Sequence, residues 1–277
     1  MKKVLSFAIF IFAVLTGLSF LLYPTVSDYI NKLHQSKAID EYVNEASSLE
    51  KSEYDKLLKE ANEYNADTLN RVNPFVKTKS QNKTYEERLN ITKTGMMGYI
   101  EIPSINLNLP IYHGTSNNVL QRGIGHLDWT SLPVGGKNTH TVLSGHRGLP
   151  SAKLFTNLSD ISVGDIFVIR VLNKTLTYRV DKILTVLPED TSALQILEGE
   201  DLCTLVTCTP YGINTHRLLV RGHRVENTFE SGAVTVISDA IQIEPVTVAL
   251  FIAVIILILM SVLRITKNCI KNFKRVN

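Results

Sequence analysis

A cysteine, a histidine and an arginine are the residues whose types could perform chemistry in this chain. Cys208 ends the apolar stretch LVTC and precedes Thr-Pro-Tyr-Gly, which places a thiol at a strand end before a loop. Arg217 begins the next strand-like stretch, and His146 lies in Ser-Gly-His-Arg-Gly at the end of another. A thiol nucleophile needs activation, which an imidazole or a guanidinium supplies, and an arginine can also bind an oxyanion. Spacing alone makes the trio a candidate for acyl transfer and no more.

Structural roles are the simpler interpretation of the other cysteine and histidine residues in this region. Cys203 lies among leucines and is predicted to be a small buried hydrophobe. It is five residues from Cys208, so the two thiols should lie on opposite faces of a strand, about 16 Å apart, too far for a disulfide. We interpret four histidines as surface, packed or hydrogen-bonded residues: His34, His113, His126 and His140.

The elements that must position the trio are strands. After Thr94 the hydrophobic pattern takes a period of two, and Gly and Pro separate the apolar stretches. Seven stretches are predicted as strands: 98–105, 107–114, 139–146, 165–172, 175–184, 202–210 and 216–225. Seven or more short strands with few helical stretches predict an all-β barrel or sandwich with insertions.

A helical region precedes the strands. Apolar residues recur at threes and fours from Asp28 to about Tyr64, which predicts helix. The stretch from Asn65 to Lys93 shows no such period and is expected to be irregular. It contains Asn73-Pro74-Phe75.

Two uncharged runs could cross a membrane: Val4–Tyr23 and Val246–Leu263. Basic residues flank both on the outer ends of the chain, so the positive-inside rule predicts that both termini are cytoplasmic. Residues 24–245 then lie outside the cell, with 22 basic residues against 26 acidic ones, a net charge of −4. The overall charge of +3 is therefore a topology signal and does not indicate nucleic-acid binding. A cleaved signal peptide is the alternative for the first run.

Two motifs resemble the active-site segments of sortases, the membrane-anchored cysteine transpeptidases of Gram-positive bacteria. They are THTVLSGHRG at 139–148 and TLVTCTPYGINTHRLLVRGHR at 204–224. The resemblance implies that Cys208 is the nucleophile, His146 the general acid and base, and Arg217 the contact to the substrate and oxyanion. It is best to class C, the pilus-assembling sortases, in which a lid precedes the barrel. That lid usually carries Asp-Pro-aromatic, whereas this chain has Asn73, Pro74 and Phe75 and so lacks the carboxylate.

The resemblance also implies a fold, which is mainly β: a closed sortase-like barrel with short helices, an N-terminal helical and lid region, and two flanking membrane helices. The expected divisions are an anchor (1–23), the helical and lid region (24–94), the barrel (95–228), a linker (229–245), a second span (246–263) and a basic cytoplasmic tail (264–277).

The implied reaction cleaves an LPXTG-like sorting signal between Thr and Gly and joins a pilin to a lysine amine of the next pilin. The expected partners are pilins or surface proteins with such signals, and the membrane. No cofactor is expected, and no metal, because the histidines and acids show no compact ligand spacing. Three alternatives remain: anchoring of single proteins to the peptidoglycan cross-bridge, a catalytically silent pilin-binding scaffold, and a hydrolytic cysteine peptidase.

Overall fold

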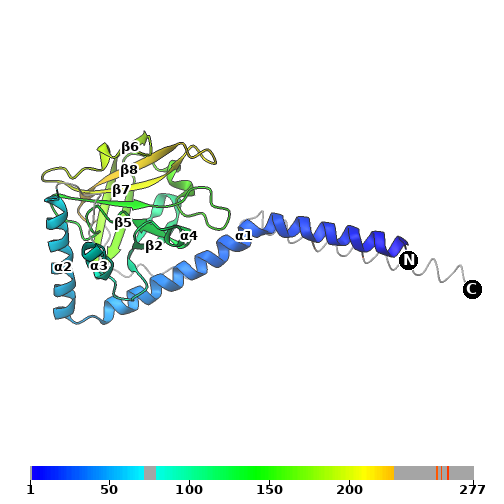
Figure 1. Cartoon of the computed structure of the whole chain (residues 1–277), viewed down its shortest axis with the longest axis horizontal. Coiled ribbons are helices and arrows are strands. Elements are labelled where there is room, and N and C mark those ends of the chain that lie inside the picture. The colour runs from blue at the N-terminus through cyan, green and yellow to red at the C-terminus, as the bar shows by residue number, and fades with distance from the viewer. Residues whose placement is uncertain (1, 72–78, 228–253, 255–256, 258–260, 262–277) are drawn as a thin grey trace, which may run out of the picture. The chain divides into compact units, whose positions relative to one another are not determined.

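The protein folds as a closed β-barrel preceded by helices (Figure 1). The structure, a computed structural model, describes residues 2–71, 79–227, 254, 257 and 261. Around the barrel the strands follow the order β1-β2-β3-β4-β7-β8-β6-β5. Their bounds are β1 Met96–Ile102, β2 Leu107–His113, β3 Ile124–His126, β4 Thr139–Ser144, β5 Ile166–Val171, β6 Lys174–Val186, β7 Asp201–Thr209 and β8 His216–Val225.

All seven predicted strands are present, and the barrel contains one more. β3 has only three residues, which is too short for an alternating pattern to be visible in the sequence. It closes the barrel because it pairs in parallel with β2 and antiparallel with β4. The pairing of β4 with β7 is also parallel, and the remaining pairs are antiparallel.

One apolar cluster fills the barrel interior. β3 and β4 each contribute one residue to it, and each of the other strands contributes two or more. Phe167 and Tyr178 stack there with ring centroids 5.4 Å apart. Gly222 of β8 is required beside them, because a Cβ at that position would lie 2.7 Å from the Phe167 ring. Such close packing of large rings against a bare backbone holds the sheet in its closed form.

Two long helices precede the barrel where one continuous helical pattern was predicted. α1 spans Lys2–Ser48 and α2 spans Lys51–Leu69, with a break at residues 49 and 50. The Tyr42 hydroxyl fixes α1 to the barrel, since it donates to Met97 O at 2.9 Å and accepts from Leu172 N at 2.8 Å. α1 therefore continues from the first apolar run directly onto the barrel wall.

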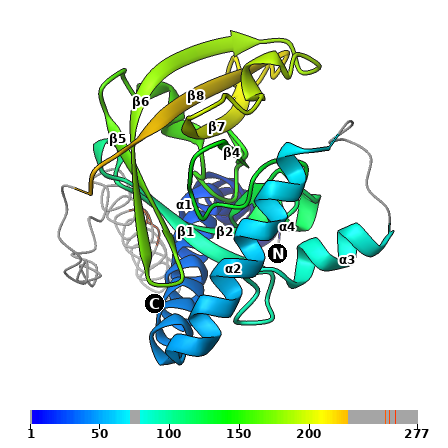
Figure 2. The same cartoon turned by 90° about the vertical axis from the view of Figure 1, so that its left-hand side faces the viewer.

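The prediction that residues 65–93 are irregular is wrong in part. α2 continues to Leu69, and α3 spans Lys79–Glu87. α3 is a short polar helix, KSQNKTYEE, so it carries no apolar period from which to predict it. Figure 2 shows α2 and α3 beside the barrel, and Tyr85 attaches α3 to β3 through His126 Nδ1 at 2.9 Å.

Only part of the two-span prediction can be followed in the structure. Among the described residues, one helix is long and apolar enough to cross a membrane, within Ile9–Ser48. The predicted second span, Val246–Leu263, lies outside the described residues except for three positions. Four shorter helices lie between strands: η1 Pro103–Ile105, α4 Asn117–Arg122, η2 Thr156–Asp160 and η3 Ser192–Leu194.

Candidate active site

The pairing of β7 with β8 places two of the three candidate residues side by side. Cys208 is the penultimate residue of β7, and its register partner on β8 is Arg217. Both side chains are partly exposed. Residues opposite one another in neighbouring strands point to the same face of a sheet, with strands about 4.8 Å apart. The thiol and the guanidinium therefore share one end of one face.

The pairing of β4 with β7 brings the third residue to the same place. The parallel register ends at Ser144 opposite Val206. Beyond it, Gly145 N still donates to Val206 O at 3.0 Å, and Thr207 Oγ1 donates to Gly145 O at 2.7 Å. The next residue on each chain, His146 and Cys208, is therefore at the same level. His146, just beyond the end of β4, Cys208 of β7 and Arg217 of β8 form a row, which we call the His–Cys–Arg row.

Gly145 makes this approach possible. A Cβ there would lie 2.7 Å from both Ile124 Cδ1 and Phe155 Cδ2, so any larger residue would displace the segment that carries His146. The chain then folds back on itself, since Phe155 N donates to His146 O at 3.0 Å. The imidazole is thus presented from a short loop attached to the barrel at both ends, and it remains partly exposed.

A tight turn between β7 and β8 holds the guanidinium. Ile213 N and Asn214 N both donate to Pro210 O, and Gly212 adopts a left-handed φ of 76° that favours glycine. Arg217 Nη1 donates to Asn214 O at 3.2 Å and to His216 O at 3.0 Å. The guanidinium is therefore held by backbone carbonyls of its own turn, and no carboxylate among the described residues forms an ion pair with it.

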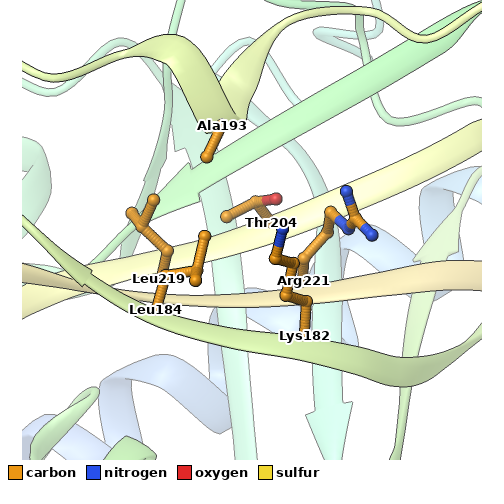
Figure 3. A pocket seen from close by; sticks show the side chains of 6 residues that line it. All are labelled: Lys182, Leu184, Ala193, Thr204, Leu219 and Arg221. Carbon is orange, nitrogen blue, oxygen red and sulfur yellow. The ribbon is translucent and has the colours of Figure 1, made fainter.

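Next to the row, the same face of the sheet carries an apolar patch. Val206 of β7 lies opposite Leu219 of β8, and Leu219 lies opposite Leu184 of β6. Leu194 of η3 packs on this face from the connection between β6 and β7. Figure 3 shows a hollow here, toward which Ala193 projects; its lining is Lys182, Leu184, Ala193, Thr204, Leu219 and Arg221. Its volume of about 10 Å³ is about the space of one water molecule.

His140 also lies on this face, and its contacts confirm the structural interpretation. Its Nδ1 lies 2.8 Å from Gln195 O and its Nε2 lies 2.7 Å from Thr204 Oγ1. A neutral ring satisfies both by donating from Nδ1 and accepting at Nε2. Burial lowers the pKa of His140, which keeps the ring neutral. His140 thereby fastens the β6–β7 connection to β4 and β7.

The other three histidines also have the roles predicted for them. His34 is exposed on α1. His126 is buried with Nε2 2.8 Å from Ser131 O, and His113 lies between Gly95 O and Arg88 O at 2.8 and 2.7 Å. Among the described residues, no cluster of His, Cys, Asp or Glu could hold a metal ion.

The outcome for the remaining predicted positions is mixed. Cys203 is fully buried and unpaired, as predicted, and Cys208 is also a free thiol. Asn73, Pro74 and Phe75 lie outside the described residues. The sequence interpretation missed Thr207 and Arg147, which join β7 to the segment that follows β4. A threonine in a strand and an arginine beside a histidine carry no distinguishing pattern, so only the folded arrangement reveals them.

Known proteins resemble this chain over the barrel. The sortase domain profile matches residues 100–225. Sortase D of Bacillus subtilis is 32% identical over 131 residues, which make up 46% of this chain and 63% of that protein. This chain thus matches slightly less than two thirds of that relative.

Three solved structures are similar over a larger part of their length. Sortase C1 from Streptococcus agalactiae is 52% identical with a TM-score of 0.67, covering 69% of this chain and 99% of that one. Streptococcus pneumoniae sortase C is 45% identical (TM-score 0.61; 69% and 97% covered). Clostridium perfringens sortase C, solved with a C-terminal cell wall sorting motif, is 44% identical (TM-score 0.61; 69% and 100% covered). With a relative 52% identical and matched over nearly its whole length, this chain belongs to the sortase family of cysteine transpeptidases.

Proposed function

We propose that this protein is a class C sortase that joins pilin subunits through a thioacyl intermediate. The observation that supports the proposal is the strand register, which pairs Cys208 with Arg217 and extends, one residue beyond Gly145, toward His146. Cys208 is partly exposed near a strand end. A nucleophile flanked by a base and an oxyanion donor is the arrangement that acyl transfer requires.

In the proposed reaction the Cys208 thiol gives its proton to His146, and Sγ attacks the threonine carbonyl carbon of an LPXTG-like sorting signal. His146 protonates the departing glycine amine as the Thr–Gly bond breaks, and a thioester remains on Cys208. A lysine amine of the next pilin then attacks the thioester and gives its proton to His146. The bond between Sγ and the acyl carbon breaks, the new amide leaves, and Cys208 takes the proton back from His146, so protons and bonds balance over the two steps.

Arg217 is the proposed donor to the developing oxyanion or to the backbone of the signal. Its guanidinium has five N–H donors, and Nη1 makes both of its bonds to turn carbonyls. The remaining donors are therefore available to a substrate carbonyl. Because no carboxylate of the described residues neutralises it, its positive charge would act in full on an oxyanion.

The apolar patch next to the row is the proposed site for the leucine and proline of the signal. Val206, Leu219 and Leu194 offer the apolar contacts that such side chains need. The hollow on that face is too small for a leucyl side chain, so binding requires the β6–β7 connection, residues 187–200, to move outward. Such a movement would lengthen or break the hydrogen bond from His140 to Gln195 O.

Two features support the pilus-assembling class. The similar solved structures of Streptococcus agalactiae, Streptococcus pneumoniae and Clostridium perfringens are named as sortases C, and the Streptococcus pneumoniae work concerns pilin substrate specificity. In addition, helices α1, α2 and α3 precede the barrel, which the class C resemblance implies. The sorting-motif complex of the Clostridium perfringens protein suggests the same kind of substrate here.

We further propose that Asn73-Pro74-Phe75 is a lid over the row. The described flanks of this segment are attached to β3 and to the turn that follows it. In α2, Asn65 Nδ2 donates to Leu132 O at 3.2 Å and Asn65 Oδ1 accepts from Leu132 N at 2.7 Å. In α3, Tyr85 contacts His126. The short chain between these two anchors starts and ends beside β3 and the turn that follows it.

The proposed location is the cell membrane, with the barrel outside and both termini in the cytoplasm. α1 supplies the first span. Single reporter cysteines in an otherwise cysteine-free chain test this: one at Asn173 should react with an impermeant reagent in whole cells, and one at Lys271 should not. Labelling at Lys271 contradicts the arrangement.

A product assay tests the proposed function. The full chain in detergent is mixed with a pilin that carries an LPXTG-like signal, and products are separated by mass. A ladder of pilin polymers linked through lysine supports the proposal. Pilin released only as the free acid would indicate a peptidase, transfer only to a cross-bridge peptide would indicate wall anchoring, and binding without cleavage would indicate a scaffold.

A further inference from the structure

Arg147 follows His146 directly and bonds to the residue that follows Cys208. Its Nη1 donates to Thr209 Oγ1 at 3.1 Å, and its Nη2 donates to Ser159 Oγ of η2 at 2.9 Å. Its Nε is buried and makes no hydrogen bond within the described part of the chain. One guanidinium thus joins its own segment to η2 and to the end of β7.

The backbone alone does not fix His146 beside Cys208. Regular pairing of β4 with β7 ends at Ser144, and the last backbone bond between the two segments is from Gly145 N to Val206 O. Beyond that point, side chains join the segment after β4 to β7. A segment that leaves the sheet at the end of a strand without such bonds would be free to move away from the neighbouring strand.

Two side-chain bonds bracket the His146–Cys208 pair, one residue to either side. On one side Thr207 Oγ1 donates to Gly145 O, and on the other Arg147 donates to Thr209 Oγ1. In a strand, alternate side chains point to opposite faces. The two threonines therefore bond on one face of β7 while Cys208 points to the other, where the row lies.

We propose that Arg147 is a positioning residue that holds the imidazole of His146 at a fixed distance from the thiol of Cys208. The proposal rests on the proposed function, because it matters only if these two groups act together. The planar guanidinium uses separate nitrogens to donate to the hydroxyls of Thr209 and Ser159. A lysine has a single ammonium nitrogen, which cannot occupy both positions at once. Removal of the bond from Arg147 to Thr209 would let the His146 segment drift from β7.

The first test is kinetic and uses the full chain with a fluorogenic LPXTG-like peptide. Arg147→Lys and the nearly isosteric Thr209→Val should each lower kcat about 10- to 100-fold with KM changed less than about 2-fold, since a displacement near 1 Å can cost about 100-fold. The double variant should be no slower than the worse single variant, because both remove one bond. Ser159→Ala should have a smaller effect, and Arg179→Lys, an exposed arginine of β6, should have none.

The second test does not depend on the reaction. Hydrogen exchange of residues 145–149 should become faster in Arg147→Lys and Thr209→Val, with β4 residues 139–143 unchanged. If exchange and kcat both match the unsubstituted protein, or if the double variant shows additive losses, the positioning role is wrong. If the unsubstituted protein binds the peptide without cleaving it, the proposed function fails, and the exchange data alone decide whether Arg147 holds the segment.

Discussion

The two cysteines of β7 lie on the same strand but in opposite chemical environments. Cys203 faces the barrel interior opposite Gly222 and is fully buried. Burial, with the nearby charge of Asp201 as a smaller contribution, raises the pKa of its thiol well above the ordinary range. Cys208 faces the other side, near the strand end, opposite Arg217 and beside the His146 segment. The face to which each side chain points and its distance from the strand end therefore decide which thiol is buried and which is accessible.

Two arginines of β8 show the same principle on a single face. Arg221 forms a bidentate pair with Asp181, at 3.1 Å from Nε and 2.6 Å from Nη2. Arg217, four residues nearer the turn, forms hydrogen bonds only to backbone carbonyls within the described part of the chain. A carboxylate beside the first arginine neutralises its charge, whereas the second keeps a charge that a substrate could use. The end of the sheet near the turn thus differs from its middle in charge balance.

The largest expected effect tests the difference between the two thiols. Cys208→Ala should reduce thioacyl trapping and polymer formation to background, because no other nucleophile stands in the row. Cys203→Ala should keep kcat within about 3-fold and lower the free energy of unfolding by about 1 kcal/mol, through loss of a small buried group. Mass spectrometry of the trapped enzyme and urea unfolding measure the two effects. An active Cys208→Ala protein would refute the assignment.

The arginine comparison predicts the next largest effect. Arg217→Lys should lower kcat about 100- to 1,000-fold, as expected for loss of an oxyanion donor. Arg221→Lys should leave kcat within about 3-fold and cost at most about 1 kcal/mol of stability, since its ion pair is partly exposed. Steady-state rates with the sorting peptide distinguish the two. Equal losses of kcat in both variants would contradict a specific role for Arg217 in the reaction.

The proposed lid should affect only the outer thiol. Phe75→Ala should speed modification of Cys208 by a small thiol reagent about 5-fold, because an apolar cover is lost. Asn73→Asp should slow it, through a charged hydrogen bond to Arg217. Cys203 should stay unmodified in every variant and so reports that the barrel remains folded. Unchanged rates in both substitutions would show that this segment does not cover the row.

The smallest expected effect concerns His140, the buried histidine of the active face. Burial lowers the pKa of His140, so the folded state binds a proton less readily than the unfolded state, whose pKa is about 6.5. The free energy of unfolding should be highest above that pH and fall as the pH drops toward the folded pKa of His140. In His140→Asn the free energy of unfolding should fall less steeply between pH 7 and 5. Part of the fall should remain, because burial also lowers the pKa of His113. Urea unfolding at several pH values measures the slope, and an unchanged slope would contradict this role.

Local pattern explains which parts of the fold the sequence could predict. Seven strands have enough alternating residues to show a period of two, and the apolar run at the start of α1 is long enough to show a span. β3 and α3 were missed for the same reason, because one is too short and the other too polar for any period. The break between α1 and α2 was also missed, since the apolar spacing continues across residues 49 and 50.

The sequence by itself determined the chemical types at the site and the face of its strand to which each points. A thiol near a strand end, an arginine at the next strand start and a histidine after a third strand are local properties, and the motif resemblance named their roles. The tertiary structure alone decided which strands are neighbours. His146 lies beside Cys208 because β4 pairs in parallel with β7, and the bond from Arg147 to Thr209, which are 62 positions apart, depends on the same pairing. Strand order is set by closure of the barrel around its core, a non-local balance of packing that no spacing along one strand encodes.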